Sequence, residues 1–124
     1  MSTLANLQVL VVEDESLVAM LIEAMLEDAG CVVVGPASRV GEALELLADH
    51  AAIDLALLDV NVAGEAVFPV AEALAARNIP FVFSTGYGEG GLPDAWRGRP
   101  VVQKPFTEES LRKTLETTAQ AITA

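Results

Sequence analysis

The sequence predicts an α/β protein, a doubly wound (βα)5 unit whose five parallel strands lie in the order 2-1-3-4-5. Five short apolar runs alternate with longer stretches of helical period, and a chain of 124 residues suits one domain. Short apolar runs are typical of parallel strands that helices cover on both faces. We expect the strands at residues 7–12, 31–34, 53–58, 81–83 and 101–102.

The stretches between the runs carry helix signals. Apolar residues from Val18 to Ala29 fall along one stripe, and Gly30 stands where a helix end favours a positive φ. Ser38 is the expected N-cap of the second helix, and Thr107 is the expected N-cap of the last. The weakest stretch runs from residue 86 to residue 98, where five glycines and a proline predict a short or frayed helix.

The composition narrows the class of function. Eighteen acidic residues against seven Lys and Arg give a net charge of −11, which repels nucleic-acid backbones and anionic lipid surfaces. A bound cation or a cationic partner fits this charge better. No stretch approaches the ~18 apolar residues of a membrane span, and the first residues lack the pattern of an export signal, so we expect a cytoplasmic protein. The lone Cys31 is expected to be a small buried hydrophobic residue.

Polar groups follow the predicted strands at the points where their apolar runs stop. In an open α/β sheet, ligand chemistry collects beyond the carboxyl ends of the strands, at the switch between strands 1 and 3. These positions hold Glu13 and Asp14, Asp59, Ser84 and Thr85, and Gln103 with Lys104 and Pro105.

Converging carboxylates predict a metal site. Three of them in one pocket would raise one another's pKa unless a cation were present. Asp14 and Asp59 supply hard oxygen ligands, the backbone carbonyl of Asn61 is a third, and Glu13 is expected to act through a water. Such a sparse ligand set, completed by waters, suits Mg²⁺.

Lys104 and Thr85 suit a transferring phosphoryl group. The ammonium keeps Asp59 ionised and binds a phosphoryl oxygen, and the hydroxyl donates to another. With a carboxylate nucleophile and a metal, the site has the parts for aspartyl phosphorylation. His50 lies at the end of the second predicted helix and is expected outside this cluster.

These residues resemble the response-regulator receiver family, in order and spacing over essentially the whole chain. The resemblance implies the CheY-like, flavodoxin-like fold, with residues 1–124 as one receiver domain and no output domain. It also implies an acidic Mg²⁺ pair at Glu13 and Asp14, phosphoacceptor Asp59, a metal-ligating carbonyl at Asn61, and phosphate-binding Thr85 and Lys104. The motifs that carry it are Leu10-Val11-Val12-Glu13-Asp14-Glu15, Leu57-Leu58-Asp59-Val60-Asn61, Thr85-Gly86 and Lys104-Pro105-Phe106.

The same resemblance implies a role and partners. A histidine kinase or histidine phosphotransferase would supply the phosphoryl group, and a downstream protein would receive the signal. We expect a monomer or weak dimer that binds neither nucleic acid nor membrane. It would be no turnover enzyme, with only self-phosphorylation from a phosphodonor and autodephosphorylation. The Lys104-Pro105 peptide is typically cis in that family.

Residues 80–88, Pro-Phe-Val-Phe-Ser-Thr-Gly-Tyr-Gly, are similar to the Phe-Ala-Thr-Gly-Tyr motif of the alphaproteobacterial FAT GUY receivers, with Ser84 at the alanine position. Those proteins are single-domain regulators that are often tied to general stress-response phosphorelays. One departure from the wider family is Val101, where an aromatic switch residue is usual. Tyr87 either replaces that switch or simply packs.

Two alternative functions stay open at this point. A Mg²⁺-dependent phosphohydrolase on a doubly wound sheet also uses an aspartate at a strand end, but it needs a second acid where this chain has Asn61. A receiver-like binding module that is never phosphorylated would not need the set of Asp14, Asp59, Thr85 and Lys104. A nucleotide-binding domain is disfavoured, since no glycine-rich phosphate loop follows the first strand.

Overall fold

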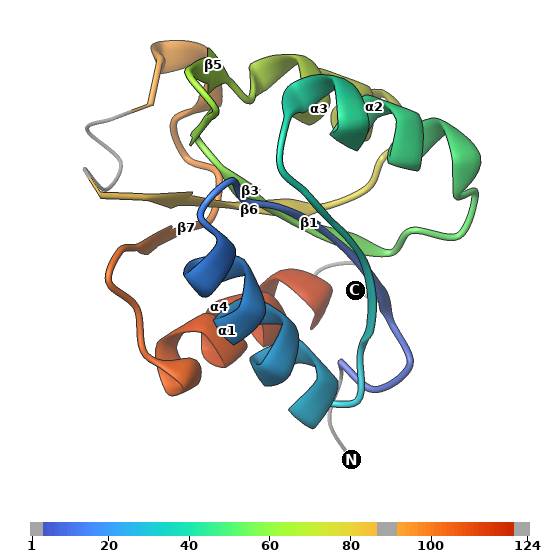
Figure 1. Ribbon diagram of the computed structural model, residues 1–124, viewed down its shortest axis with the longest axis vertical. Coiled ribbons are helices and arrows are strands. Elements are labelled where there is room, and N and C mark those ends of the chain that lie inside the picture. The colour runs from blue at the N-terminus through green and yellow to red at the C-terminus, as the bar shows by residue number, and fades with distance from the viewer. Residues whose placement is uncertain (1–3, 87–91, 121–124) are drawn as a thin grey trace.

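The computed structural model describes residues 4–86 and 92–120. A five-stranded sheet lies between two helical layers, with α2 and α3 on one face and α1 and α4 on the other (Figure 1). The strands of this sheet are β1 Gln8–Val12, β2 Val32–Ala37, β3 Leu55–Asp59, β6 Phe81–Thr85 and β7 Val101–Gln103. The α-helices are α1 Ser16–Asp28, α2 Val40–Asp49, α3 Phe68–Ala76 and α4 Glu108–Gln120.

The strand order is β2-β1-β3-β6-β7, and every pairing in this sheet is parallel. Counted along the chain, these five strands lie in the predicted order 2-1-3-4-5. The (βα)5 expectation differs in one place. Between β6 and β7 the described residues hold a 3-10 helix, Asp94–Trp96, in place of an α-helix, and residues 87–91 lie outside the described part of the chain.

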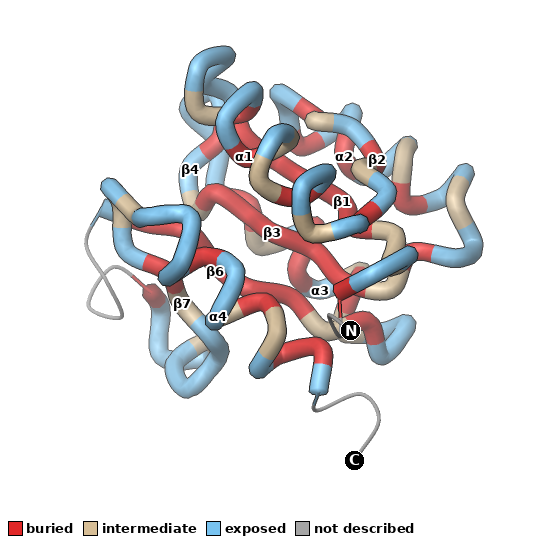
Figure 2. Tube along the Cα trace, turned by 90° about the horizontal axis from the view of Figure 1, so that it is seen from below, coloured by how far each residue is buried: buried red, intermediate tan, exposed pale blue. Residues whose placement is uncertain are grey.

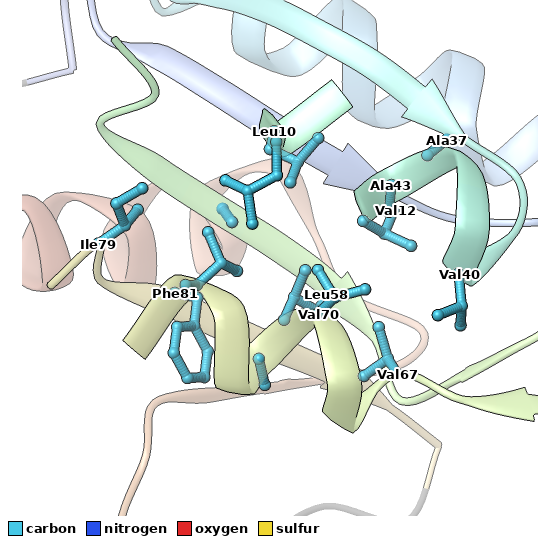
Figure 3. Close-up of a cluster of buried hydrophobic side chains, with 14 of the residues drawn as sticks. Leu10, Val12, Ala37, Val40, Ala43, Leu58, Val67, Val70, Ile79 and Phe81 are labelled. Carbon is cyan, nitrogen blue, oxygen red and sulfur yellow. The ribbon is translucent and has the colours of Figure 1, made fainter. Parts of the chain in front are cut away.

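Alternate residues of the central strands fill two separate cores. Leu10 and Leu58 belong to the core under α2 and α3, which Figure 3 shows, whereas Val11 and Leu57 belong to the core under α1 and α4. Burial on both faces explains why these strands read as continuous apolar runs. Figure 2 shows β1 and β3 buried through the middle of the molecule.

The two predicted helix caps have different outcomes. Thr107 caps α4 as predicted, because the backbone N–H of Ser110 donates to Thr107 Oγ1 at 3.0 Å. Ser38 as the N-cap of α2 is wrong: the N-cap is Arg39, one residue later. Arg39 makes no side-chain cap hydrogen bond. Ser38 instead donates its backbone N–H to Glu42 Oε1 at 2.7 Å, which tethers the entering chain to the first turn.

An aromatic cluster fixes the 3-10 helix to the rest of the fold. Trp96 stacks on Phe68 at the start of α3, with a centroid distance of 6.0 Å, and meets Phe81 and Phe83 of β6 edge to face. The Arg99 guanidinium lies over the Phe81 and Trp96 rings at 4.9 and 5.6 Å. Aromatic and cation–π contacts thus hold this short segment against α3 and β6.

A two-stranded hairpin begins two residues after Asp59. Its strands are β4 Asn61–Val62 and β5 Glu65–Ala66, which pair antiparallel. The two loop residues, Ala63 and Gly64, both have positive φ, 52° and 82°, the backbone that a tight hairpin turn requires. The hairpin shapes the loop beside Asp59 and leads into α3.

Two expectations about individual residues are confirmed. Cys31 is buried and its Sγ lies 3.4 Å from the Leu4 carbonyl oxygen. His50 is the C-cap residue of α2, and its Nδ1 lies 2.8 Å from the Leu46 carbonyl oxygen. Within residues 4–86 and 92–120, no helix has the length and apolar character needed to cross a membrane.

Candidate functional site

Three carboxylates meet at the carboxyl edge of the sheet. Glu13 and Asp14 directly follow β1, and Asp59 is the last residue of the neighbouring strand β3. One oxygen from each of them lies within 4.8 Å of the others. The structure therefore brings together the three acidic residues that the sequence placed at the switch between strands 1 and 3.

Lys104 supplies the positive charge of this cluster. It directly follows β7, and its backbone N–H donates to the Thr85 carbonyl at 2.9 Å, which ties it to the end of β6. Its peptide bond with Pro105 is cis, as the family resemblance implies. The ammonium donates to both carboxylate oxygens of Glu13, at 2.9 and 3.0 Å, and to Asp59 Oδ2 at 3.2 Å.

Glu13 lies deeper than its predicted role requires. Its side chain is only 1% exposed, and both of its oxygens accept from Lys104. Burial, with a smaller contribution from neighbouring Asp59, raises the pKa of Glu13 to about 8 from an ordinary value near 4.5, although Lys104 opposes the change. Without a further cation, this carboxyl therefore binds its proton more tightly than an ordinary glutamate does.

The pKa of Lys104 shifts in the direction that keeps its charge. Burial disfavours the ammonium, but the hydrogen bond to Glu13 and the charges of Asp59 and Glu13 outweigh burial and raise the pKa of Lys104. A permanent cation consequently faces Asp59.

The hairpin after Asp59 holds the other two carboxylates in place. The Ala63 backbone N–H donates to Asp14 Oδ2 at 3.0 Å, and the Asn61 backbone N–H donates to Asp59 Oδ1 at 3.3 Å. The contact from Ala63 was not predicted, because alanine at a left-handed turn position carries no sequence signal. The exposed Asp14 is thus oriented by a backbone donor 49 residues away.

These residues fit a divalent magnesium ion. Three ionised carboxylates and one ammonium would leave two negative charges, which one divalent cation neutralises. Their oxygens lie within 4.8 Å of one another, close to the ~4 Å span of two ligands that each bind Mg²⁺ at 2.0–2.1 Å. All the side-chain donors are hard oxygen atoms, the kind that Mg²⁺ prefers. The family resemblance noted from the sequence implies Mg²⁺ in an acidic pocket of this kind.

The other sequence-predicted residues have mixed outcomes. Thr85 is buried at the end of β6, next to the Lys104 backbone, so the structure brings it to the same edge. Val101 pairs with Phe83 in register and packs against the core under α2 and α3. Tyr87, the switch candidate, lies outside the described residues.

The raised pKa of Glu13 predicts a pH dependence of stability. In EDTA, we expect the free energy of unfolding to fall as the pH rises from about 4.5 to about 8, because the folded state holds a proton that the unfolded chain releases. Denaturant unfolding at a series of pH values measures this. Glu13→Gln should flatten the slope, whereas Glu15→Gln, at an exposed neighbouring acid, should leave it unchanged. Equal slopes for the wild type and Glu13→Gln would contradict the assignment.

Comparisons with known proteins agree with this geometry. The family profile "Response regulator receiver domain" matches residues 9–116. The phyllosphere-induced regulator PhyR of Methylorubrum extorquens is 32% identical over 103 residues, which cover 80% of this chain and 38% of PhyR. This chain therefore spans well under two thirds of that relative.

Similar solved structures include two of the protein SdrG. The solution structure of SdrG from Sphingomonas melonis Fr1 is 46% identical, with a TM-score of 0.82 over 97% of this chain and 99% of SdrG. The BeF3-activated conformation of SdrG is 48% identical, with a TM-score of 0.76 over 90% of this chain and 94% of that one. With a family match over most of its length and a cluster of three carboxylates, two of them bound to one lysine, this chain belongs to the response regulator receiver family.

Proposed function

We propose that Asp59 is the phosphoacceptor of a stand-alone receiver. The observation that carries this proposal is the position of Lys104, which reaches the carboxylate at the end of β3 and the one after β1 at the same time. Asp59 is largely buried, but its side chain keeps 11% exposure, so the carboxylate remains accessible to a phosphodonor. Receiver domains act as phosphoryl-accepting switches rather than as turnover enzymes.

The proposed reaction moves a phosphoryl group from a phosphohistidine to Asp59. An Asp59 oxygen attacks the phosphorus of a phosphohistidine, a new P–O bond forms, and the P–N bond breaks. The imidazole nitrogen leaves with the electron pair and takes up a proton. With acetyl phosphate as donor, acetate leaves instead. Loss of the group to water, as the only other reaction of the chain, would return Asp59 to its carboxylate.

Each site residue has a proposed part in this transfer. Asp14, Asp59 and the Asn61 carbonyl would hold Mg²⁺, with Glu13 acting through a water, and the ion would neutralise charge on the phosphoryl oxygens. The Lys104 ammonium would break its hydrogen bonds with Glu13 and donate to a phosphoryl oxygen instead. The released Glu13 would then lie beside the metal site, because one of its oxygens is within 4.8 Å of those of Asp14 and Asp59.

Output would pass through contacts with other proteins. Lys104 is joined to Thr85 through the backbone, so movement of either residue on phosphorylation would reach β6, β7 and the segment between them. A net charge of −11 argues against binding to nucleic acid or membranes. The chain would act as a monomer or weak dimer in the cytoplasm, where kinases have ATP.

A place in a stress-response phosphorelay is proposed from similarity. PhyR is described as a stress response regulator, and a PhyR structure is 30% identical to this chain. The SdrG structure matches nearly the full length of both chains. On that basis, we assign residues 1–124 to a single receiver domain in a relay of the same kind.

The donor is proposed to dock on α1. This helix begins two residues after Asp14, and it presents three apolar side chains to solvent: Leu17 is 81% exposed, Met20 is 64% exposed and Leu21 is 51% exposed. An apolar patch of this kind beside an acceptor site is typical of a protein interaction surface. It suits the helical domain of a histidine kinase or histidine phosphotransferase.

Of the two alternative functions, the family match argues against the phosphohydrolase, and the non-phosphorylated receiver is left to experiment. Family membership removes the phosphohydrolase reading, in which Asn61 would have to be an acid. A receiver that is never phosphorylated would have the same fold and the same ion pair. Only a phosphorylation assay distinguishes it from the proposed phosphoacceptor.

Replacing Asp59 with Asn should reduce labelling by radioactive acetyl phosphate to background, because the amide is a poor nucleophile toward phosphorus. Labelled protein on a gel measures this. Asp49→Asn, at an exposed acid that ends α2, is the control and should label like the wild type. Undiminished labelling of Asp59→Asn would place the phosphoryl group elsewhere, and an unlabelled wild type would favour the non-phosphorylated binding module.

Asp14→Asn should raise the Mg²⁺ concentration for half-maximal labelling by about tenfold or more, because it removes a charged ligand. A magnesium titration of the labelling rate measures this, with EDTA expected to abolish labelling. Glu15→Gln changes the adjacent exposed acid and should leave the titration unmoved. The same Mg²⁺ dependence in Asp14→Asn and the wild type would remove Asp14 from the metal site.

The double variant Leu17→Ser and Met20→Ser should slow phosphotransfer from the cognate histidine kinase or phosphotransferase by about tenfold, and it should label normally with acetyl phosphate. The expected loss follows from the apolar contact area removed from the interface. Profiling against the host's histidine kinases identifies the donor. Leu44→Ser, at an exposed leucine on α2, is the control. Equal slowing with acetyl phosphate would show damage to the site rather than to docking.

A further inference from the structure

Ser84 carries a buried hydroxyl without a partner. The residue is only 2% exposed, and among the buried side-chain oxygens of residues 4–86 and 92–120 its Oγ is the one that makes no hydrogen bond. A buried polar group that stays unpaired costs stability. This hydroxyl is therefore available to an acceptor that comes within its reach.

Ser84 lies beside Asp59. The two residues are Cα partners in the pairing of β3 with β6, and the Val60 backbone N–H donates to the Ser84 carbonyl at 3.1 Å. Neighbouring strands are about 4.8 Å apart, and partners in register point to the same face of a parallel sheet. Leu57 and Val82, two residues earlier on each strand, both face the core under α1 and α4. The side chains of Asp59 and Ser84 therefore start from the same face, one strand apart.

The other neighbour of Ser84 leads to Lys104. Ser84 pairs with Val102 of β7, and Lys104 follows Val102 by two residues. Ser84 thus lies between the strand that ends in Asp59 and the strand that leads to its counter-charge. In the unphosphorylated protein both oxygens of Asp59 already have donors, the Asn61 backbone N–H on Oδ1 and the Lys104 ammonium on Oδ2.

We propose that Ser84 is a positioning residue for the phosphorylated state: its hydroxyl donates to the acyl oxygen of Asp59 that Lys104 leaves when it turns to the phosphoryl group. This inference rests on the proposed function. Phosphorylation makes one Asp59 oxygen the bridge to phosphorus and leaves the other as a carbonyl, which remains a hydrogen-bond acceptor. Ser84 is the adjacent group with a free donor.

The experiment is a beryllium titration of the purified protein in excess fluoride and Mg²⁺, followed by NMR, with Ser84→Ala as the main variant. Beryllofluoride binds one aspartate oxygen as the phosphoryl group would, and leaves the other free. In Ser84→Ala, loss of one hydrogen bond should raise the beryllium concentration needed for half-saturation by about 5–10-fold. Ser84→Cys keeps a side chain of similar size with a weaker donor. Its half-saturation concentration should lie between those of the wild type and Ser84→Ala.

A second readout separates positioning from packing. Because Ser84→Ala removes an unpaired hydroxyl, its denaturant midpoint without beryllofluoride should equal or exceed that of the wild type. A lower midpoint would show that the hydroxyl is already paired and would overturn the inference. Thr118→Ala is the matched control, since Thr118 is also buried but its hydroxyl donates to the Thr114 carbonyl at 2.8 Å; its beryllofluoride affinity should be unchanged.

The outcomes distinguish this inference from the function on which it rests. If Ser84→Ala binds beryllofluoride within about twofold of the wild type while Asp59→Asn does not bind it, Ser84 has no part and Asp59 remains the acceptor. If the wild type itself fails to bind beryllofluoride and is not labelled by acetyl phosphate, the proposed function fails, and this inference fails with it.

Discussion

One ion-pair cluster joins three strands of the sheet at their carboxyl ends. Lys104, after β7, is bound to Glu13, after β1, and to Asp59, at the end of β3. Charged groups with so little exposure are costly unless each is paired. The cluster therefore depends on the sheet order, because parallel strands end at the same edge and only β6 separates β7 from β3. It also leaves an excess of negative charge, which favours a divalent cation at this edge.

Much of the fold could be predicted because the central strands are buried on both faces. Leu10 and Val11 of β1, like Leu57 and Leu58 of β3, serve opposite cores, so the strands read as unbroken apolar runs. The segment between β6 and β7 could not be predicted in the same way. Its 3-10 helix depends on contacts of Trp96 with residues from α3 and β6, and such distant contacts leave no local pattern.

In the site, the residues that meet at the sheet edge could be predicted, but the contacts of their side chains could not. Asp14, Asp59 and Lys104 could be placed together, because parallel strands share a carboxyl edge. The preference of Lys104 for Glu13 depends on side-chain reach in the folded protein, and the contact from Ala63 to Asp14 depends on a left-handed backbone that alanine does not signal. The unpaired state of Ser84 became visible only once its neighbours were known.

The aromatic cluster gives the protein an intrinsic optical probe. Trp96 is the only tryptophan of the chain, and its ring is in contact with Phe83, the residue two positions before Thr85 on β6. Indole emission depends on the polarity and packing around the ring. Rearrangement between β6 and β7 would thus register as a change in ultraviolet fluorescence, so the kinetics of signalling can be followed in real time on the native sequence without an attached dye.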